Sequence, residues 1–229
     1  MVKDQLKLAS LIVSALLVQL VVQNFGQELN SLIFNSSKNS FMWPHFILRN
    51  GLAMIFIFLV IKAPLKQMGL TWPQLEKRNW IFLFFLLVII TMAVYHYTHH
   101  DLSVHYYAKN YANHATHPWV RIKHFFIFTF STLIGYELLH RCLLLFGIII
   151  ILTKNAKIHV PWAQLLAILI VTCFETLFHL VKPPGESFGM LLASPFLSYL
   201  AIRSKSIWPS FLLHLYIEFV FIFFLVFTL

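Results

Sequence analysis

Three pairs of ionisable residues lie inside long apolar stretches of this sequence, with the members of each pair four positions apart. They are Glu137 with Arg141, Glu175 with His179, and His214 with Glu218. Residues four positions apart share one face of an α-helix. An unpaired charge near the centre of a bilayer costs about 2.5–3.5 kcal/mol on insertion scales, so these side chains should face one another or a hydrated cavity. Carboxylates and imidazoles that meet around water can act as general bases, so activation of water is the chemistry this set could perform.

Each pair also has a purely structural interpretation. Glu137 and Arg141 can form an ion pair that holds helices together, and a lone histidine in a membrane helix often bonds a neighbouring helix. Repetition of the pair on three separate stretches favours a function, which can coexist with the ion pair. His140 adjoins Arg141 on a different helix face, so we expect it to be structural. Glu186 follows Pro-Pro-Gly, and we expect it in a loop or at a helix start.

The elements that position these residues are helices long enough to cross a bilayer. Hydrophobic residues make up 59% of the 229 residues and charged residues only 11%, against roughly a quarter charged in soluble domains. A span needs about 20 apolar residues. Seven such spans are predicted, at about 8–24, 44–61, 80–97, 122–151, 160–181, 187–203 and 207–228. The predicted fold is therefore an all-α, polytopic transmembrane helical bundle, with residues 1–229 as a single membrane domain.

The distribution of Lys and Arg predicts how this bundle is oriented. One side of the membrane would carry ten of them: Lys3, Lys7, Lys62, Lys66, Lys77, Arg78, Lys154, Lys157, Arg203 and Lys205. The other side would carry six: Lys38, Arg49, Lys109, Arg121, Lys123 and Lys182. Arg49 is expected to reach outward from near the end of its span. Because cytoplasmic loops carry the excess of positive charge, we expect an integral multi-pass protein of a bacterial inner membrane with its N-terminus in the cytoplasm.

Two features of the composition are assigned to the membrane environment. The net charge of +9 arises from bases scattered at span ends and not from a basic stripe, which favours membrane lipids as partners over nucleic acid. Residues 63–80 mix apolar residues and bases, as is typical of a segment at the cytoplasmic interface. Residues 96–117 are rich in histidine and tyrosine, and we interpret them as an external loop outside the site.

The three polar pairs also occur in a recognisable order of motifs. The segments YELLHR (136–141), ETLFH (175–179) and HLYIE (214–218) stand where EExxxR, FxxxH and HxxxN would stand, and IRSKSIWPSFLLH precedes the last of them. This arrangement resembles the CPBP family of intramembrane proteases, also called the Abi or CAAX protease family. The resemblance covers about residues 60–220 and is most specific between 130 and 218. It implies a catalytic-type core at 122–228.

Three positions depart from the family pattern. Tyr136 replaces the first glutamate, which activates water in the family; Glu175 replaces the phenylalanine, and Glu218 replaces the final asparagine. Arg141, His179 and His214 match. Loss of catalysis would ordinarily leave apolar residues at such positions, because charge in lipid is costly. New acids beside the histidines instead favour a rebuilt site, with Glu137 or Glu175 as the general base.

The resemblance implies an endopeptidase that uses glutamate and histidine to activate water against a membrane-tethered peptide or protein. Its expected catalytic residues are Glu137, Arg141, Glu175, His179, His214 and Glu218. His179, His214, Glu175 and Glu218 together offer nitrogen and oxygen ligands suited to zinc, which makes zinc a candidate cofactor. Two other interpretations remain open. One is a catalytically inactive relative that binds a partner, such as an immunity-type protein, and the other is a transporter or proton relay.

Overall fold

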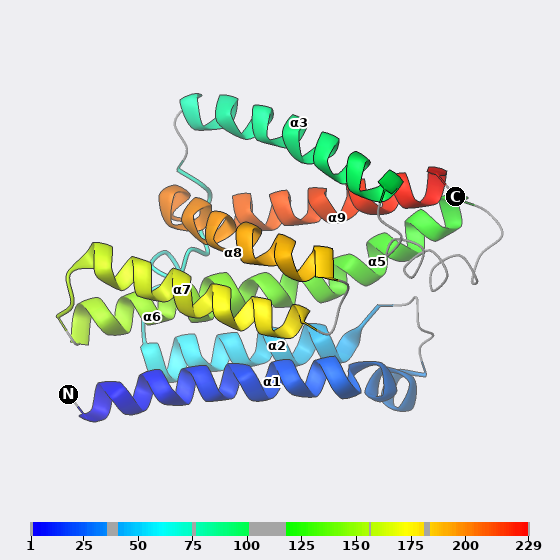
Figure 1. Ribbon diagram of the computed structural model, residues 1–229. Helices are drawn as coiled ribbons and strands as arrows, with labels where there is room; N and C mark the ends of the chain where they lie inside the picture. The colour runs from blue at the N-terminus through cyan, green and yellow to red at the C-terminus, as the bar shows by residue number, and fades with distance from the viewer. Residues whose placement is uncertain are drawn as a thin grey trace.

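A computed structural model describes residues 2–35, 41–74, 77–100, 118–155, 157–180 and 184–228. Within these ranges every regular element is a helix, as Figure 1 shows. In chain order they are α1 (Val2–Phe34), α2 (Trp43–Ile55), η1 (Phe56–Ile61), α3 (Lys77–His100), α5 (Pro118–Glu137), η2 (Leu138–Phe146), α6 (Gly147–Ile150), η3 (Ile151–Asn155), α7 (Val160–His179), α8 (Pro184–Ser204) and α9 (Trp208–Thr228). The elements labelled η are π-helical. The prediction of an all-α helical bundle is confirmed.

Within the described residues, consecutive elements join into seven rods that correspond to the seven predicted spans. In the same part of the chain, four helices are long and apolar enough to cross a membrane: Asp4–Phe34, Trp43–Ile61, Phe126–Lys154 and Val160–His179. Shorter apolar stretches occur at Leu86–His96 and Trp208–Phe221. Most of the predicted boundaries hold to within a few residues, but α1 runs well beyond the predicted 8–24 at both ends. The His-rich loop expected at 96–117 lies mostly outside the described residues.

The rod that runs from α5 through η2 to α6 is the centre of the bundle (Figure 1). In its most apolar 18-residue stretch 72% of the residues are buried, against 22–33% in the corresponding stretches of the other three candidate spans. α2 and α9 pack along α5, α1 lies against α2, and the α7–α8 hairpin covers η2. α3 packs on the outer side of α9. A polar residue on the inward faces of the central rod is therefore shielded from lipid by several helices.

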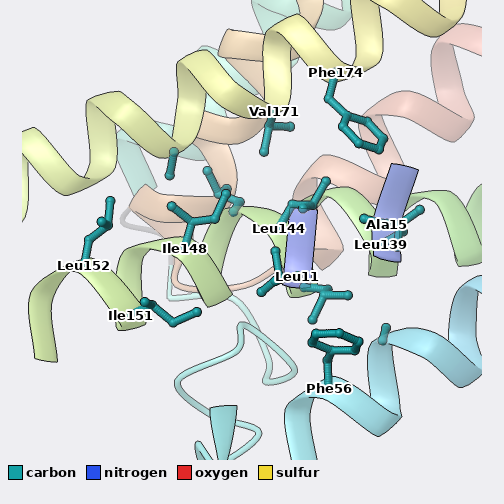
Figure 2. Close-up of a cluster of buried hydrophobic side chains, with 14 of the residues drawn as sticks. Leu11, Ala15, Phe56, Leu139, Leu144, Ile148, Ile151, Leu152, Val171 and Phe174 are labelled. Carbon is teal, nitrogen blue, oxygen red and sulfur yellow. The ribbon is translucent and has the colours of Figure 1, made fainter. Parts of the chain in front are cut away.

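The main apolar core surrounds the second half of the central rod. Figure 2 shows Leu139, Leu144 and Ile148 of this rod lying between Leu11 of α1 and Val171 of α7. Small residues, Ala163 and Ala167 on α7 and Ala201 on α8, are fully buried at these contacts. Small side chains let membrane helices approach closely, which favours van der Waals packing where no hydrophobic force acts between helices. This core lies directly beside the polar residues and fixes their backbone.

A glycine allows α2 to approach the central rod where the polar residues begin. A Cβ atom at Gly135 would lie 3.0 Å from the Cβ atom of Arg49 and 3.0 Å from the backbone oxygen of His45. Contacts this short are tighter than most in packed proteins, so glycine lets the two helices approach without displacing Arg49 or the His45 backbone. The result is that the Arg49 side chain is placed beside Tyr136, the next residue along the rod.

The segment that follows η1 is tied to the turn between α8 and α9. The Ile207 amide donates to the Gly69 carbonyl at 3.0 Å, and the Gln74 amide donates to the Ser204 carbonyl at 2.9 Å. Ser206 adds a bond from its hydroxyl to the Thr71 carbonyl. These bonds fix the start of α9 and thereby the position of its polar residues along the axis of the bundle.

Candidate active site

The central rod changes from α-helix to π-helix inside the polar cluster. α5 ends at Glu137, and the π-helical turns of η2 begin at Leu138. A π-helix has wider turns than an α-helix, and such segments occur often at functional sites. The residues after Glu137 are therefore rotated from the positions that an α-helical wheel assigns. Glu137, His140 and Arg141 are all fully buried on the inward side.

Glu137 connects the central rod to α9. Its Oε1 atom accepts a hydrogen bond from Nδ1 of His214 at 2.7 Å. Its Oε2 atom accepts one from the Ser210 hydroxyl at 3.1 Å and lies 3.8 Å from Nε of Arg141. Ser210 and His214 are one helical turn apart on α9, and each donates a hydrogen bond to a different oxygen of the same carboxylate. The rotamer of Glu137 is thus fixed from a neighbouring helix.

Glu175 brings a second carboxylate to the same arginine from α7. Its Oε1 atom lies 2.7 Å from Nη1 of Arg141 and 3.9 Å from Nδ1 of His140. Both Glu175 and Arg141 are completely buried. A hydrogen-bonded contact of this length between ionised groups is strong, and breaking it would leave a buried charge without its partner. Arg141 therefore lies between two carboxylates and links three helices through them.

Three histidines of the cluster each bond an oxygen through Nδ1. His140 bonds the Tyr136 carbonyl at 2.7 Å, His179 bonds the Glu175 carbonyl at 2.8 Å, and His214 bonds the Glu137 carboxylate at 2.7 Å. A carbonyl only accepts, so Nδ1 must carry the proton in His140 and His179, and the carboxylate favours the same tautomer in His214. This orientation leaves the Nε2 atom of each neutral ring as its basic nitrogen.

The ring of Tyr136 lies beside all three imidazoles. Its ring centroid lies 3.9 Å from that of His140, 5.7 Å from that of His214 and 6.3 Å from that of His179. The last two contacts are edge-to-face, a favourable geometry for aromatic rings. Residues of η2, α7 and α9 thus converge on one side chain of α5, and His179 joins the cluster through it.

Arg49 of α2 also contacts the Tyr136 ring, a contact that no sequence pattern indicates. Its guanidinium carbon lies 5.5 Å from the ring centroid, within the range of a cation–π contact. The side chain is only 4% exposed and donates to Gln19 of α1 at 3.1 Å and to the Thr132 carbonyl at 3.0 Å. The expectation that Arg49 reaches outward to the interface is wrong, because the inward-facing partners stabilise it more effectively.

The structure brings most of the predicted site residues together. Glu137, Arg141, Glu175 and His214 are in direct contact, and His179 adjoins them across Tyr136. Glu218 lies at the edge: its Oε1 atom is 4.0 Å from Nε2 of His214, and its side chain is 37% exposed. His140, expected on a different helix face from Arg141, lies beside the same carboxylate, with Nδ1 3.9 Å from Oε1 of Glu175, because the π-helical turns rotate it inward; its structural role stays a prediction. Ser210, Arg49 and Tyr136 join the site, and no spacing signal in the sequence marks the first two.

The charges of the cluster balance. Two buried carboxylates, Glu137 and Glu175, are accompanied by two buried guanidinium groups, Arg141 and Arg49. A charge in a low-dielectric interior is tolerated when it is paired and hydrogen-bonded. With neutral histidines the cluster carries no net charge, which explains how so many ionisable groups persist inside an apolar bundle.

The predicted zinc ligands do not gather around a common point. Among the residues that the structure describes, no three or more His, Cys, Asp or Glu side chains are grouped so that they could hold a metal ion. Glu175 bonds Arg141 instead, and the Nδ1 atom of His214 bonds Glu137. A structural zinc site needs four ligands and a catalytic one three, in tetrahedral geometry. The side chains as arranged do not fit zinc.

Comparison with known protein families identifies the segment that contains this cluster. Residues 118–220 match the family model described as Type II CAAX prenyl endopeptidase Rce1-like. The resemblance to CAAX proteases is confirmed. The Rce1-like segment spans α5 to most of α9 and contains every site residue except Arg49 and Gln19. No curated protein and no solved structure matches the chain.

The Rce1-like match also bears on where the protein resides. The match and the long apolar helices together identify the chain as an integral membrane protein. The matching family model describes a CAAX prenyl endopeptidase, and the match assigns no catalytic residue to this chain.

Proposed function

We propose that this protein is an intramembrane endopeptidase that hydrolyses a peptide bond in a membrane-tethered peptide or protein. The observation that carries the proposal is the 2.7 Å bond between Glu137 and His214, buried within the Rce1-like segment. A carboxylate that holds Nδ1 of an imidazole fixes the tautomer and ring orientation, and it stabilises the imidazolium that forms when Nε2 takes a proton. Glu137 and His214 form such a pair.

In the proposed reaction, His214 is the general base. Its Nε2 atom lies 4.0 Å from the Glu218 carboxylate, at the more exposed edge of the cluster. A polar separation longer than a direct hydrogen bond can accommodate a bridging water. This water would attack the scissile carbonyl carbon and give its proton to Nε2. The imidazolium would then return the proton to the leaving nitrogen, which releases a carboxylate and an amine.

The other residues hold this pair in place. Ser210 and Arg141 fix the second oxygen of Glu137, and Glu175 fixes Arg141 from α7. His179 faces the same tyrosine as His214 and is proposed to contact the substrate peptide from the opposite side. Substrate and catalytic groups held within rigid helices lose little orientational freedom during the reaction, which is a major source of catalysis.

The proposal includes a setting for the reaction. The excess of Lys and Arg on one side of the spans supports an N-terminus in the cytoplasm, and we propose the bacterial inner membrane as the location. Membrane lipids and a lipid-anchored or membrane-spanning peptide are the partners. Zinc also remains a sequence-based prediction, which metal analysis of the purified protein would test.

Cleavage assays on the detergent-purified protein test the proposal. Fluorogenic peptides carrying a prenyl or acyl chain should be cleaved by the unmutated chain. Removing a triad-type base or its orienting carboxylate typically costs about 10²–10⁴ in kcat, so His214→Ala and Glu137→Gln should lower it by that order. His159→Ala is the matched control, because His159 is exposed at the start of α7, away from the cluster. Full activity in His214→Ala would refute the mechanism.

One observation favours a second candidate function. Tyr136 occupies the position of the glutamate that activates water in the resembled family, and the Glu175 carboxylate is engaged by an arginine. A relative that has lost catalysis could use the same buried cluster to bind a partner protein, as an immunity-type membrane protein does. This alternative predicts that the unmutated chain cleaves no lipidated peptide. It also predicts that His214→Ala weakens partner binding, because His214 is part of the cluster.

A further inference from the structure

The hydroxyl of Tyr136 is one of the buried polar groups of the cluster that the reaction above does not use; among the described residues, Nε2 of His140 and Nη2 of Arg141 also lack a hydrogen-bond partner. The side chain is 7% exposed, and among the described residues its hydroxyl oxygen has no hydrogen-bond partner. A tyrosine hydroxyl that is buried usually finds one. Tyr216 on α9 illustrates the usual case, since its hydroxyl lies 2.7 Å from that of Thr91.

The ring of Tyr136 and its hydroxyl have separate roles in this arrangement. The ring is held by three imidazoles and by the guanidinium of Arg49. The hydroxyl takes no part in the hydrogen bonds of the cluster: the oxygens of Glu137 are bonded to His214 and Ser210, and Nη1 of Arg141 bonds Oε1 of Glu175. Phenylalanine would therefore satisfy every contact seen at this position. The chain instead places an O–H donor inside a bundle where an unpaired polar group is costly.

The hydroxyl belongs to a residue that adjoins the proposed base. The same ring touches His214 and His179, so a carbonyl group positioned for attack by a water on His214 would also lie close to Tyr136. When water attacks a peptide carbonyl, negative charge develops on the carbonyl oxygen. A preorganised donor aimed at this oxygen stabilises the transition state more than the ground state, and tyrosine hydroxyls serve in this role.

We propose that the Tyr136 hydroxyl is a catalytic donor that binds the carbonyl oxygen of the scissile peptide and stabilises the oxyanion formed on it. The inference rests on the endopeptidase activity proposed above. The phenolic proton stays on tyrosine throughout: the C–O bond forms between water and the carbonyl carbon, the water's proton passes to His214, and Tyr136 contributes only a hydrogen bond. A glutamate at this position, as in the family pattern, would accept a proton; the tyrosine donates a hydrogen bond instead.

Tyr136→Phe tests this inference because it retains the ring and removes only the hydroxyl. Loss of one oxyanion donor lowers kcat by about 10²–10³, so we expect that decrease with KM changed less than about twofold. The midpoint of unfolding should stay unchanged or rise. A peptide aldehyde, whose hydrate mimics the tetrahedral intermediate, should bind the variant more weakly by a similar factor. Tyr216→Phe is the matched control, and its kcat should equal that of the unmutated protein.

The outcomes separate this inference from the proposed function. If the unmutated chain cleaves peptide, His214→Ala does not, and Tyr136→Phe keeps kcat within about twofold, the endopeptidase stands and the donor role of Tyr136 is overturned. If the unmutated chain cleaves none of the lipidated peptides, both proposals fail. A parallel rise in KM and loss of thermal stability in Tyr136→Phe would show that the hydroxyl is structural, which also overturns the inference.

Discussion

Replacing Arg141 by methionine should destabilise the protein severely, because the guanidinium lies between two buried carboxylates. Its Nη1 atom is 2.7 Å from Glu175, its Nε atom is 3.8 Å from Glu137, and all three side chains are essentially inaccessible. Removing one partner of a buried ion pair costs roughly 3–5 kcal/mol, because the remaining charge is left uncompensated. For chains of this size 1 kcal/mol shifts the unfolding midpoint by about 2–4 °C, so the expected decrease is roughly 6–20 °C.

A double-mutant cycle separates this charge effect from the loss of packing. Glu175→Gln alone removes one carboxylate while keeping its shape, and Arg141→Met with Glu175→Gln removes one charge of each sign. The double variant should be more stable than the sum of the single effects predicts, by about 1–3 kcal/mol, since residues in direct contact couple by such amounts. The free energy of unfolding would be measured in detergent by far-UV circular dichroism.

An exposed pair supplies the control for this cycle. Lys154 donates to Gln67 at 2.6 Å, a distance as short as the buried contact, but on the surface of the protein. Lys154→Met should change stability by less than about 0.5 kcal/mol, because surface polar contacts exchange readily with water. If the single effects of Arg141→Met and Glu175→Gln added with no coupling, the ion pair would not hold α7 to the central rod, and the account of the cluster would be refuted.

Two further substitutions probe the surroundings of the cluster. Gly135→Ala should destabilise the protein by about 1–3 kcal/mol, because the added Cβ meets Arg49 at 3.0 Å, whereas Gly51→Ala, with open space around it, should be neutral or slightly stabilising in the same unfolding assay. Ser210→Ala removes one bond to Glu137 and should lower kcat about tenfold with little change in KM; equal activity would mean that His214 and Arg141 orient the carboxylate without Ser210.

The sequence was sufficient to predict the membrane helices and the inward-facing polar pairs, because both follow from the cost of polar groups in lipid. Apolar stretches near 20 residues gave the rods, and pairs such as Glu137 with Arg141 had to face the interior. The sequence did not indicate which side chain each ionisable group would contact. Arg141 lies closer to Glu175, on another helix, than to Glu137 on its own helix. Contacts between helices depend on rotation and register, which residue spacing leaves open.

The two wrong placements have identifiable physical reasons. His140 was assigned to another face on an α-helical wheel, whereas η2 is π-helical from Leu138 onward, and hydrophobic periodicity does not reveal such a change. Arg49 lies near a span end, where reaching the interface is common. Its burial depends on Gly135, 86 positions later in the sequence, which lets α2 approach closely enough for contact with Tyr136. Both misplacements concern helix rotation and distance.

Two of the three departures from the family motifs compensate each other in charge. The pattern EExxxR places two carboxylates on the same helix as its arginine; here Tyr136 removes one of them, and Glu175 adds a carboxylate from α7 at 2.7 Å from Arg141. Moving the charge back should therefore be tolerated: Tyr136→Glu should be less destabilising in a Glu175→Gln background than alone, by about 1–3 kcal/mol of unfolding free energy. Tyr136→Gln introduces a side chain of the same shape as glutamate but without its charge, so adding Glu175→Gln should not relieve its destabilisation. If Glu175→Gln relieved Tyr136→Glu and Tyr136→Gln equally, shape, and not charge balance, would link these positions.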